Sequence, residues 1–294
     1  MNDPRRAMWM MVLFTVLWTA VEATAATLLA RYSAYQVVWT RYAVHVALLA
    51  ALFAWREPSA LWRTGRTGTQ IGRSLLMLVM PASWAIATQW GVPAGTTMAV
   101  FWLAPMMVLA WAALVLGERA PLWTWGLCAL ASLGGVVLFR PSSPGGGPAD
   151  WALLAAPLAM AASFSLYLVV TRTLRTERLR TNLFHTAFWV LVALTPVMPS
   201  VWITPTPTDL ARMLLVGALG LLALWSADRL AAAAAVSVSA PLCYLQLTTT
   251  IVLMVGLGEA RLDRQHLLAL ALVSLPVFLL LARKSWPRHV TEPA

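Results

Sequence analysis

Ten long apolar runs, each close to the length of a membrane-crossing helix, limit what this chain can fold into. A helix that spans a bilayer needs about 20 mostly apolar residues. Lipid offers the backbone no hydrogen bonds, so each run is predicted to be a helix and the fold class an all-α polytopic membrane protein. The ten predicted transmembrane helices are 8–29, 35–55, 74–92, 95–116, 121–139, 151–171, 182–203, 209–227, 230–257 and 264–282.

The composition excludes a soluble protein and a disordered one. Of the 294 residues, 60% are hydrophobic and 11% are charged, whereas a soluble domain has about 45–50% apolar and about 25% charged residues. The excess of 21 Lys and Arg over 11 Asp and Glu could indicate nucleic acid, but the arginines form short clusters between apolar runs. That distribution is typical of a membrane protein, so we expect the lipid bilayer and no nucleic acid as partner.

The placement of cations predicts the orientation. With the N-terminus in the cytoplasm, fifteen Lys and Arg residues fall on the cytoplasmic side and five on the outer side, which predicts a multi-pass protein with both termini cytoplasmic. Arg5 and Arg6 before an apolar stretch also fit a cleavable signal sequence. The run continues to Ala30, however, and the repeat described next needs this helix, so we expect it to be retained.

The chain divides into two halves that resemble each other. A Pro- and Gly-rich linker, 141–150, separates a first five-helix repeat, 1–140, from a second, 151–294, with a short cytoplasmic tail. Ala-Pro followed by Gly-Glu occurs in the fourth run and again in the ninth, as Pro105 with Glu118 and Pro241 with Glu259. Five helices per half force the second copy to be inverted, and such repeats place a binding site near the bilayer midplane.

Several short motifs, in this order, resemble the drug/metabolite transporter superfamily, and specifically its ten-helix EamA type. They are Tyr32-Ser33, Gln36 to Tyr42, Leu116 to Arg119, Gly134 to Leu138 with Arg140-Pro141, Thr171 to Leu174, and Ala240 to Gln246 leading to Gly258-Glu259. The resemblance covers residues 8–285 and implies two inverted five-helix halves and transport of a small organic solute by alternating access. Similar proteins carry amino acids, aromatic compounds, nucleoside-like metabolites or opine-type metallophores, often outward. The sequence departs from the family pattern at Ser274-Leu275-Pro276, where a small Gly-containing stretch is usual.

Three ionisable residues lie within the predicted spans: Glu22, Arg41 and His45. An ionisable group in the membrane is costly and is a functional-site candidate. Glu22 and Arg41 are nearly equidistant from the connecting turn, and Arg41 and His45 share one helix face, so the three residues could form one buried cluster. Two hypotheses stay open. Glu22 and Arg41 pair permanently, or Glu22 faces the cavity and binds a proton or an amine group of the solute.

Aromatic and amide side chains complete the predicted substrate-binding or coupling set. Sixteen tryptophans suggest an aromatic wall that stacks on a planar or cationic solute. The candidates are Trp18, which shares a face with Glu22, and Gln89, Trp102, Tyr244 and Gln246. Pro105 and Pro241 are the predicted hinges, with a plain kink as the alternative. Glu118, Glu259 and Asp228 are expected at helix ends, the two glutamates bonding backbone and Asp228 in a solvated turn.

These observations predict a secondary transporter, not an enzyme. It would move a small amphiphilic metabolite, amino-acid-like, aromatic or an opine-type metallophore, across the bacterial inner membrane, as an exporter with protons as a candidate coupling ion. The alternative is an uptake or exchange carrier for a nucleoside-like metabolite such as S-adenosylmethionine, and an intramembrane enzyme is a more remote one. Catalytic and metal-ligand spacings are missing from the sequence, and it carries no phosphate-binding loop, so we expect no cofactor, metal or nucleotide.

Overall fold

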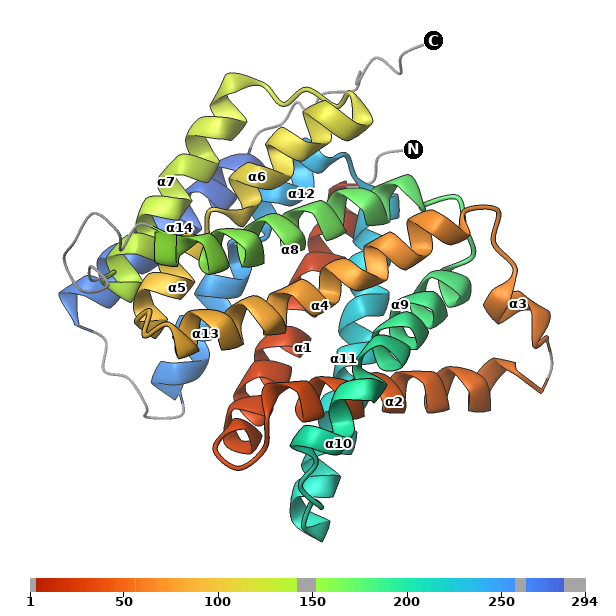
Figure 1. Ribbon diagram of the computed structural model, residues 1–294. Helices are drawn as coiled ribbons and strands as arrows, with labels where there is room; N and C mark the ends of the chain where they lie inside the picture. The colour runs from red at the N-terminus through yellow and green to blue at the C-terminus, as the bar shows by residue number, and fades with distance from the viewer. Residues whose placement is uncertain (1–3, 56, 142–151, 257–262, 283–294) are drawn as a thin grey trace.

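The computed structural model describes residues 4–55, 57–141, 152–256 and 263–282, and these residues form helices joined by short connections (Figure 1). The longer helices are α1 (Pro4–Leu29), α2 (Ala34–Phe53), α4 (Thr67–Gln89), α7 (Leu122–Phe139), α8 (Ala155–Thr173), α9 (Leu179–Leu194), α11 (Pro207–Ala233) and α14 (Arg264–Ala282). The shorter ones are α3 (Ser59–Trp62), α5 (Ala94–Phe101), α6 (Ala104–Trp111), η1 (Ala112–Leu116), η3 (Thr195–Val197), α10 (Met198–Val201), α12 (Val236–Leu242) and α13 (Leu245–Gly256).

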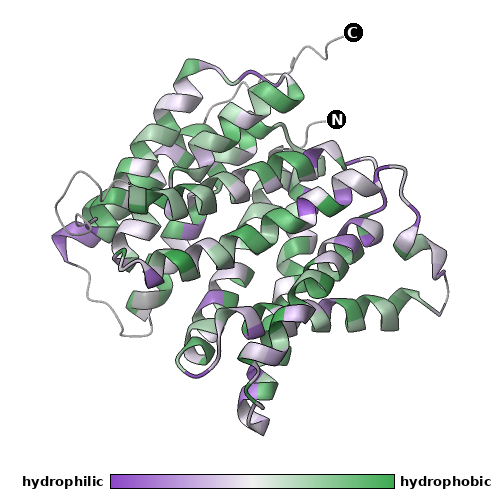
Figure 2. Ribbon diagram, viewed as in Figure 1, coloured by the Kyte–Doolittle hydropathy of each residue, from purple (hydrophilic) through white to green (hydrophobic). Residues whose placement is uncertain are grey.

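Eight helices of the described chain are long and apolar enough to cross a membrane, and two shorter apolar helices, Val238–Leu253 and Arg264–Leu280, fall where the last two spans are predicted. Many large apolar side chains point outward, for example Leu114, which is 76% exposed, and Leu122, which is 88% exposed. Figure 2 shows apolar residues along the helices and hydrophilic ones gathered mainly toward connections and helix ends. The all-α membrane class is therefore confirmed, while the count of ten spans remains a prediction.

The fourth and ninth predicted spans are each broken beside their proline. Pro105 stands at the start of α6, and Pro241 lies inside α12 just before the turn to α13. Proline has no N–H to continue a helical ladder. Beside Pro105, the backbone N–H of Met106 donates to the Leu103 carbonyl and not to the Trp102 carbonyl, its regular partner in an α-helix. The Trp102 carbonyl can therefore accept from other donors. The predicted boundary at residue 230 was wrong: α11 continues to Ala233 because the alanines there are strong helix formers.

The packing of helices follows a pattern of matched pairs. The contact of α1 with α11 is matched by that of α8 with α4, and the contact of α2 with α11 by that of α9 with α4. In addition, α2 contacts α9 and α7 contacts α14. Two glycines allow close approach in this arrangement. A Cβ at Gly217 of α11 would lie 2.5 Å from Cβ of Val44 in α2, and one at Gly134 of α7 would lie 2.7 Å from Cγ2 of Val273 in α14.

Helices at matching places in this pattern also share sequence. Gln36–Leu48 of α2 reads QVVWTRYAVHVAL, and Asn182–Leu194 of α9 reads NLFHTAFWVLVAL, with Thr, Val, Val, Ala and Leu identical at five positions. Thr69–Leu76 of α4 reads TQIGRSLL, and Thr208–Leu215 of α11 reads TDLARMLL. The shared residues lie in the same order along helices that occupy corresponding positions.

Candidate functional site

Glu22, in the middle of α1, accepts hydrogen bonds from two of the predicted site residues. The indole Nε1 of Trp18, one turn earlier, donates to Oε1 at 2.8 Å, and the amide Nε2 of Gln246 in α13 donates to Oε2 at 3.2 Å. Trp18 and Gln246 are buried, whereas the Glu22 residue is exposed. The carboxylate is therefore oriented by two donors, one from its own helix and one from α13.

Arg41 of α2 lies near the Trp18 ring. Its guanidinium carbon is 5.5 Å from the centroid of the Trp18 ring and 4.9 Å from that of Tyr42, and Phe14 stacks on Trp18 at 5.6 Å. Within the described residues no ion pair joins Arg41 to Glu22. The structure thus brings both charges to one indole ring without neutralising either by direct contact.

Buried polar atoms around Arg41 have no partner. In the part of the chain that the structure describes, Nε of Arg41, the hydroxyl of Tyr42 and both ring nitrogens of His45 are buried without a hydrogen bond. Gly220 of α11 makes room for this group, since a Cβ there would lie 3.1 Å from Nε2 of His45 and 3.2 Å from Cδ of Arg41. Unsatisfied buried polar groups are rare in folded proteins and mark places where water or a ligand binds.

Trp102 and Tyr244 form a second buried group. Their rings are 6.0 Å apart, and the hydroxyls of Tyr244 and Ser132 each donate to the Trp102 carbonyl at 3.2 Å and lie 2.7 Å from each other. This carbonyl is the one released from the helix ladder beside Pro105. The Tyr244 hydroxyl is thus used in holding the broken segments together, whereas the indole Nε1 of Trp102 is buried without a partner among the described residues.

The remaining predicted residues lie apart from Glu22. Gln89 is the last residue of α4 and is exposed, and no hydrogen bond joins it to Glu22 or Arg41 in the described chain. Pro105 and Pro241 belong to the broken segments of α6 and α12. Of the predicted set, the structure therefore brings together Trp18, Glu22, Arg41, His45 and Gln246.

A buried ion-pair network escaped the sequence analysis. Arg73 of α4 is fully buried, and its Nη1 lies 3.5 Å from Oδ1 of Asp228 in α11. Its Nη2 donates to the Asn182 carbonyl and to the Thr186 hydroxyl, both at 2.6 Å, and to Gln70 at 3.2 Å. Its Nη1 also lies 3.5 Å from the Thr171 hydroxyl of α8, so the network joins α4, α8, α9 and α11. Asp228 was expected in a solvated turn, and this expectation was wrong because Asp228 is buried in this network. The match between α4 and α11 is the signal that could have singled out Arg73.

Glu118 ties the end of the fourth predicted span to two distant segments. It pairs with Nε of Arg172 in α8 at 2.8 Å and accepts the backbone N–H of Val236, at the start of α12, at 2.8 Å. Gly117, with φ of 68°, turns the chain to aim Glu118 there, and only glycine adopts this conformation without strain. The expected bond from Glu118 to backbone is thus present, and Glu259 lies outside the described residues.

On the opposite side of the bundle, Asp209 closes the start of α11. It accepts hydrogen bonds from the Tyr32 hydroxyl at 2.9 Å and from Thr206, and it pairs with Arg31 and Arg212. Gln36 adds two bonds to the backbone of Ile203. The chain therefore has polar ties at both ends of its helices, and the Glu22 cluster lies between them along α1.

Comparison with known proteins gives two findings, while no family model matches the chain. A curated S-adenosylmethionine uptake transporter of Rickettsia prowazekii (strain Madrid E) is 24% identical over 217 residues, which are 74% of this chain and 72% of the relative. A solved structure described only as "Crystal structure of protein" aligns with a TM-score of 0.77 at 20% identity, covering 94% of this chain and 97% of the other. This second likeness concerns the fold alone. With the apolar helices, the relative supports a multi-pass membrane transporter of a small-molecule solute.

Proposed function

We propose that this chain is a secondary transporter that binds the amino-acid part of an amphiphilic solute between Glu22 and Arg41. The main support is that the Glu22 carboxylate and the Arg41 guanidinium both contact the indole ring of Trp18, while no ion pair joins them among the described residues. A solute ammonium would bind Glu22, and a solute carboxylate would bind Arg41. Charged groups in the membrane are kept where they meet a pathway for solutes or ions.

Comparison of α2 with α9 supports a functional role for these charges. In the matched segments, Arg41 corresponds to Ala187 and His45 to Leu191. The matched helix α9 therefore packs with apolar residues at the positions where α2 has Arg41 and His45. Since the fold does not require Arg41 and His45, their cost in the membrane is better explained by binding or coupling. His45 and Glu22 are the proposed positions for a coupling proton.

The aromatic residues complete the proposed site. Trp18 positions Glu22 through its N–H and offers its face to Arg41, so truncating it would disturb both charges. The unpartnered Nε1 of Trp102 is the proposed donor to the polar part of a solute farther along the pathway. Pro105 and Pro241 are the proposed hinges, because each lies at a break in a helix. Many transporters form their binding sites from discontinuous helices of this kind. Gln89 is kept as a proposed contact near the entrance.

Alternating access is proposed to arise from two inverted halves, residues 1–140 and 151–294. The matched packing of α1 on α11 with α4 on α8, and the shared sequence of α2 with α9, support this division. The polar ties at Arg73 and at Asp209 occupy opposite ends and are the proposed closures of the pathway. The arginine distribution supports cytoplasmic termini in a bacterial inner membrane. EamA-type membership is proposed from the ordered motifs of the sequence. Export is the proposed direction.

A second candidate is uptake of S-adenosylmethionine, which the name of the Rickettsia relative favours. This solute carries an amino-acid end, a positive sulfonium and a planar base. The first would fit Glu22 and Arg41, and a cation or a planar ring can interact with tryptophan faces. The two candidates share the site and differ in the solute and in the direction of net flux.

The test is equilibrium binding to the purified protein in detergent. Labelled S-adenosylmethionine and labelled neutral and aromatic amino acids are the probes. Glu22→Gln and Arg41→Gln are each expected to weaken binding of the recognised solute about tenfold or more, as a charge-assisted hydrogen bond contributes about 1.5–3 kcal/mol. Asp263→Asn, an exposed acid whose side chain is 54% accessible, is the control and should bind like the wild type. Unchanged affinity in both site variants would refute the proposed site.

A further inference from the structure

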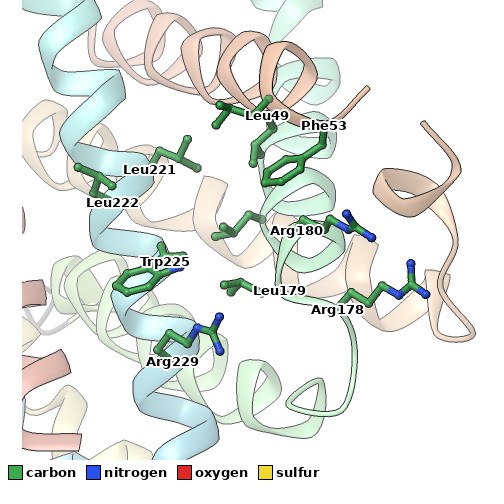
Figure 3. A pocket seen from close by; sticks show the side chains of 11 residues that line it. Leu49, Phe53, Arg178, Leu179, Arg180, Leu221, Leu222, Trp225 and Arg229 are labelled. Carbon is green, nitrogen blue, oxygen red and sulfur yellow. The ribbon is translucent and has the colours of Figure 1, made fainter. Parts of the chain in front are cut away.

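A cavity of about 590 Å³ opens between α2, α9 and α11, away from the Glu22 cluster. Its floor is made by buried leucines, Leu49, Leu183 and Leu221, and its rim by exposed ones, Leu52 and Leu222. Figure 3 shows Leu49 and Phe53 of α2, Leu179 of α9 and Leu221 of α11 around the cavity. An apolar hollow on membrane-spanning helices is a place where an acyl chain can lie.

Three arginines border the same cavity, and no acidic residue is among those that line it. Arg178 directly precedes α9, Arg180 lies in its first turn, and Arg229 lies close to the end of α11. Figure 3 shows Arg178 and Arg180 together on one side of the cavity and Arg229 on the α11 side, across from them. Since all three lie near helix ends, they are at the depth where lipid headgroups meet water.

The geometry of these arginines leaves positive charge for a ligand. Glu57, outside the lining, pairs with Arg180 and lies 3.8 Å from Arg178. One carboxylate thus serves two guanidinium groups. The Arg229 guanidinium carbon lies 5.8 Å from the centroid of the Trp225 ring, and its Nε is buried without a partner in the described chain. α9 also begins here without a side-chain cap, so its positive end faces the same side.

We propose that this cavity binds an anionic phospholipid, with its headgroup bordered by Arg178, Arg180 and Arg229 and an acyl chain over Leu52, Leu222 and Phe53. Basic pockets between transmembrane helices at the cytoplasmic face bind lipid headgroups of this kind. A free phosphate would use only the arginines and leave the leucine-lined part without an occupant. The proposal is independent of the transported solute, because its evidence lies outside the Glu22 cluster.

The test is native mass spectrometry of the purified full-length protein titrated with dioleoylphosphatidylglycerol or dioleoylphosphatidylcholine. The wild type should bind one phosphatidylglycerol with clear preference, and Arg178→Gln/Arg180→Gln/Arg229→Gln should lose roughly tenfold or more of that preference, because an arginine near an anionic lipid contributes about fivefold. The control, Arg63→Gln/Arg119→Gln/Arg175→Gln, removes equal charge from exposed positions outside the cavity and should keep it.

Two further arms separate a lipid from a simple anion. Leu222→Trp, at a side chain that is 52% exposed, fills the apolar part without removing charge and should weaken phosphatidylglycerol binding. Inorganic phosphate added at millimolar concentration should not displace the lipid. Equal loss in the control triple variant, full binding by Leu222→Trp, or displacement by phosphate would each overturn the proposal.

Discussion

Removing Arg73 should destabilise the protein more than removing any exposed arginine. Arg73→Met leaves Asp228 buried with only the 3.2 Å bond from Asn182, and it breaks the bonds to Gln70, Thr186 and the Asn182 carbonyl. Loss of one partner of a buried ion pair costs about 3–5 kcal/mol. At about 2–4 °C per kcal/mol for chains of comparable length, the melting temperature should fall by roughly 6–20 °C.

Arg212→Met is the matched control for this experiment. Arg212 occupies the position in α11 that Arg73 occupies in α4, but its side chain is 47% exposed and pairs with Asp209 three residues away. Asp209 is buried, but without Arg212 it keeps its bonds to Tyr32 and Thr206 and its pairing with Arg31, so no charge is left unpaired and the control should lose only a few degrees. Unfolding is followed by fluorescence-detected gel filtration after heating in detergent. If both variants melt at the same temperature, the buried network does not hold the four helices together.

Three further substitutions test the site and its surroundings. Trp18→Phe keeps a ring for the guanidinium but removes the 2.8 Å bond to Glu22, so solute affinity should fall about tenfold, with a modest loss of melting temperature because Trp18 is buried; unchanged affinity would contradict the positioning role. Gly217→Ala would place a Cβ 2.5 Å from that of Val44 and should cost about 1–3 kcal/mol in thermal unfolding, whereas Gly68→Ala, with open space around it in a helix, should be neutral or slightly stabilising. Tyr244→Phe removes a buried hydroxyl with two bonds and should cost about 1–3 kcal/mol by the same assay, and a neutral result would argue against its role in holding the broken helices.

Local spacing in the sequence was sufficient for part of the site. Trp18 and Glu22 are four residues apart, a separation that brings side chains together on one helix face, and the structure joins them by a hydrogen bond. Gln246 was predicted as a wall residue of the site, and in the structure it donates a hydrogen bond to Glu22. Direct pairing of Glu22 with Arg41 could not be decided from depth along the helices, because it depends on side-chain directions that spacing does not give; in the structure each contacts Trp18.

The Arg73 network could not be read from hydropathy. The third span was expected from residue 74, while α4 begins at Thr67 and carries Gln70 and Arg73 within its first two turns. A hydropathy pattern assigns such polar turns to a connection, because it does not register partners contributed by other helices. Their burial depends on Asn182 and Asp228, more than a hundred residues farther along the chain. The sequence match between Thr69–Leu76 and Thr208–Leu215 carries part of this information.

Counterflow in proteoliposomes tests the proposed carrier most directly. Vesicles loaded with unlabelled S-adenosylmethionine or an amino acid are diluted into a trace of the labelled solute, with and without a pH gradient. The account predicts transient accumulation of label for at least one solute with an amino-acid end, and its loss in Glu22→Gln while Asp263→Asn retains it. Absence of counterflow for every such solute, or equal counterflow in Glu22→Gln and the wild type, would contradict a carrier whose solute site is the Glu22 cluster.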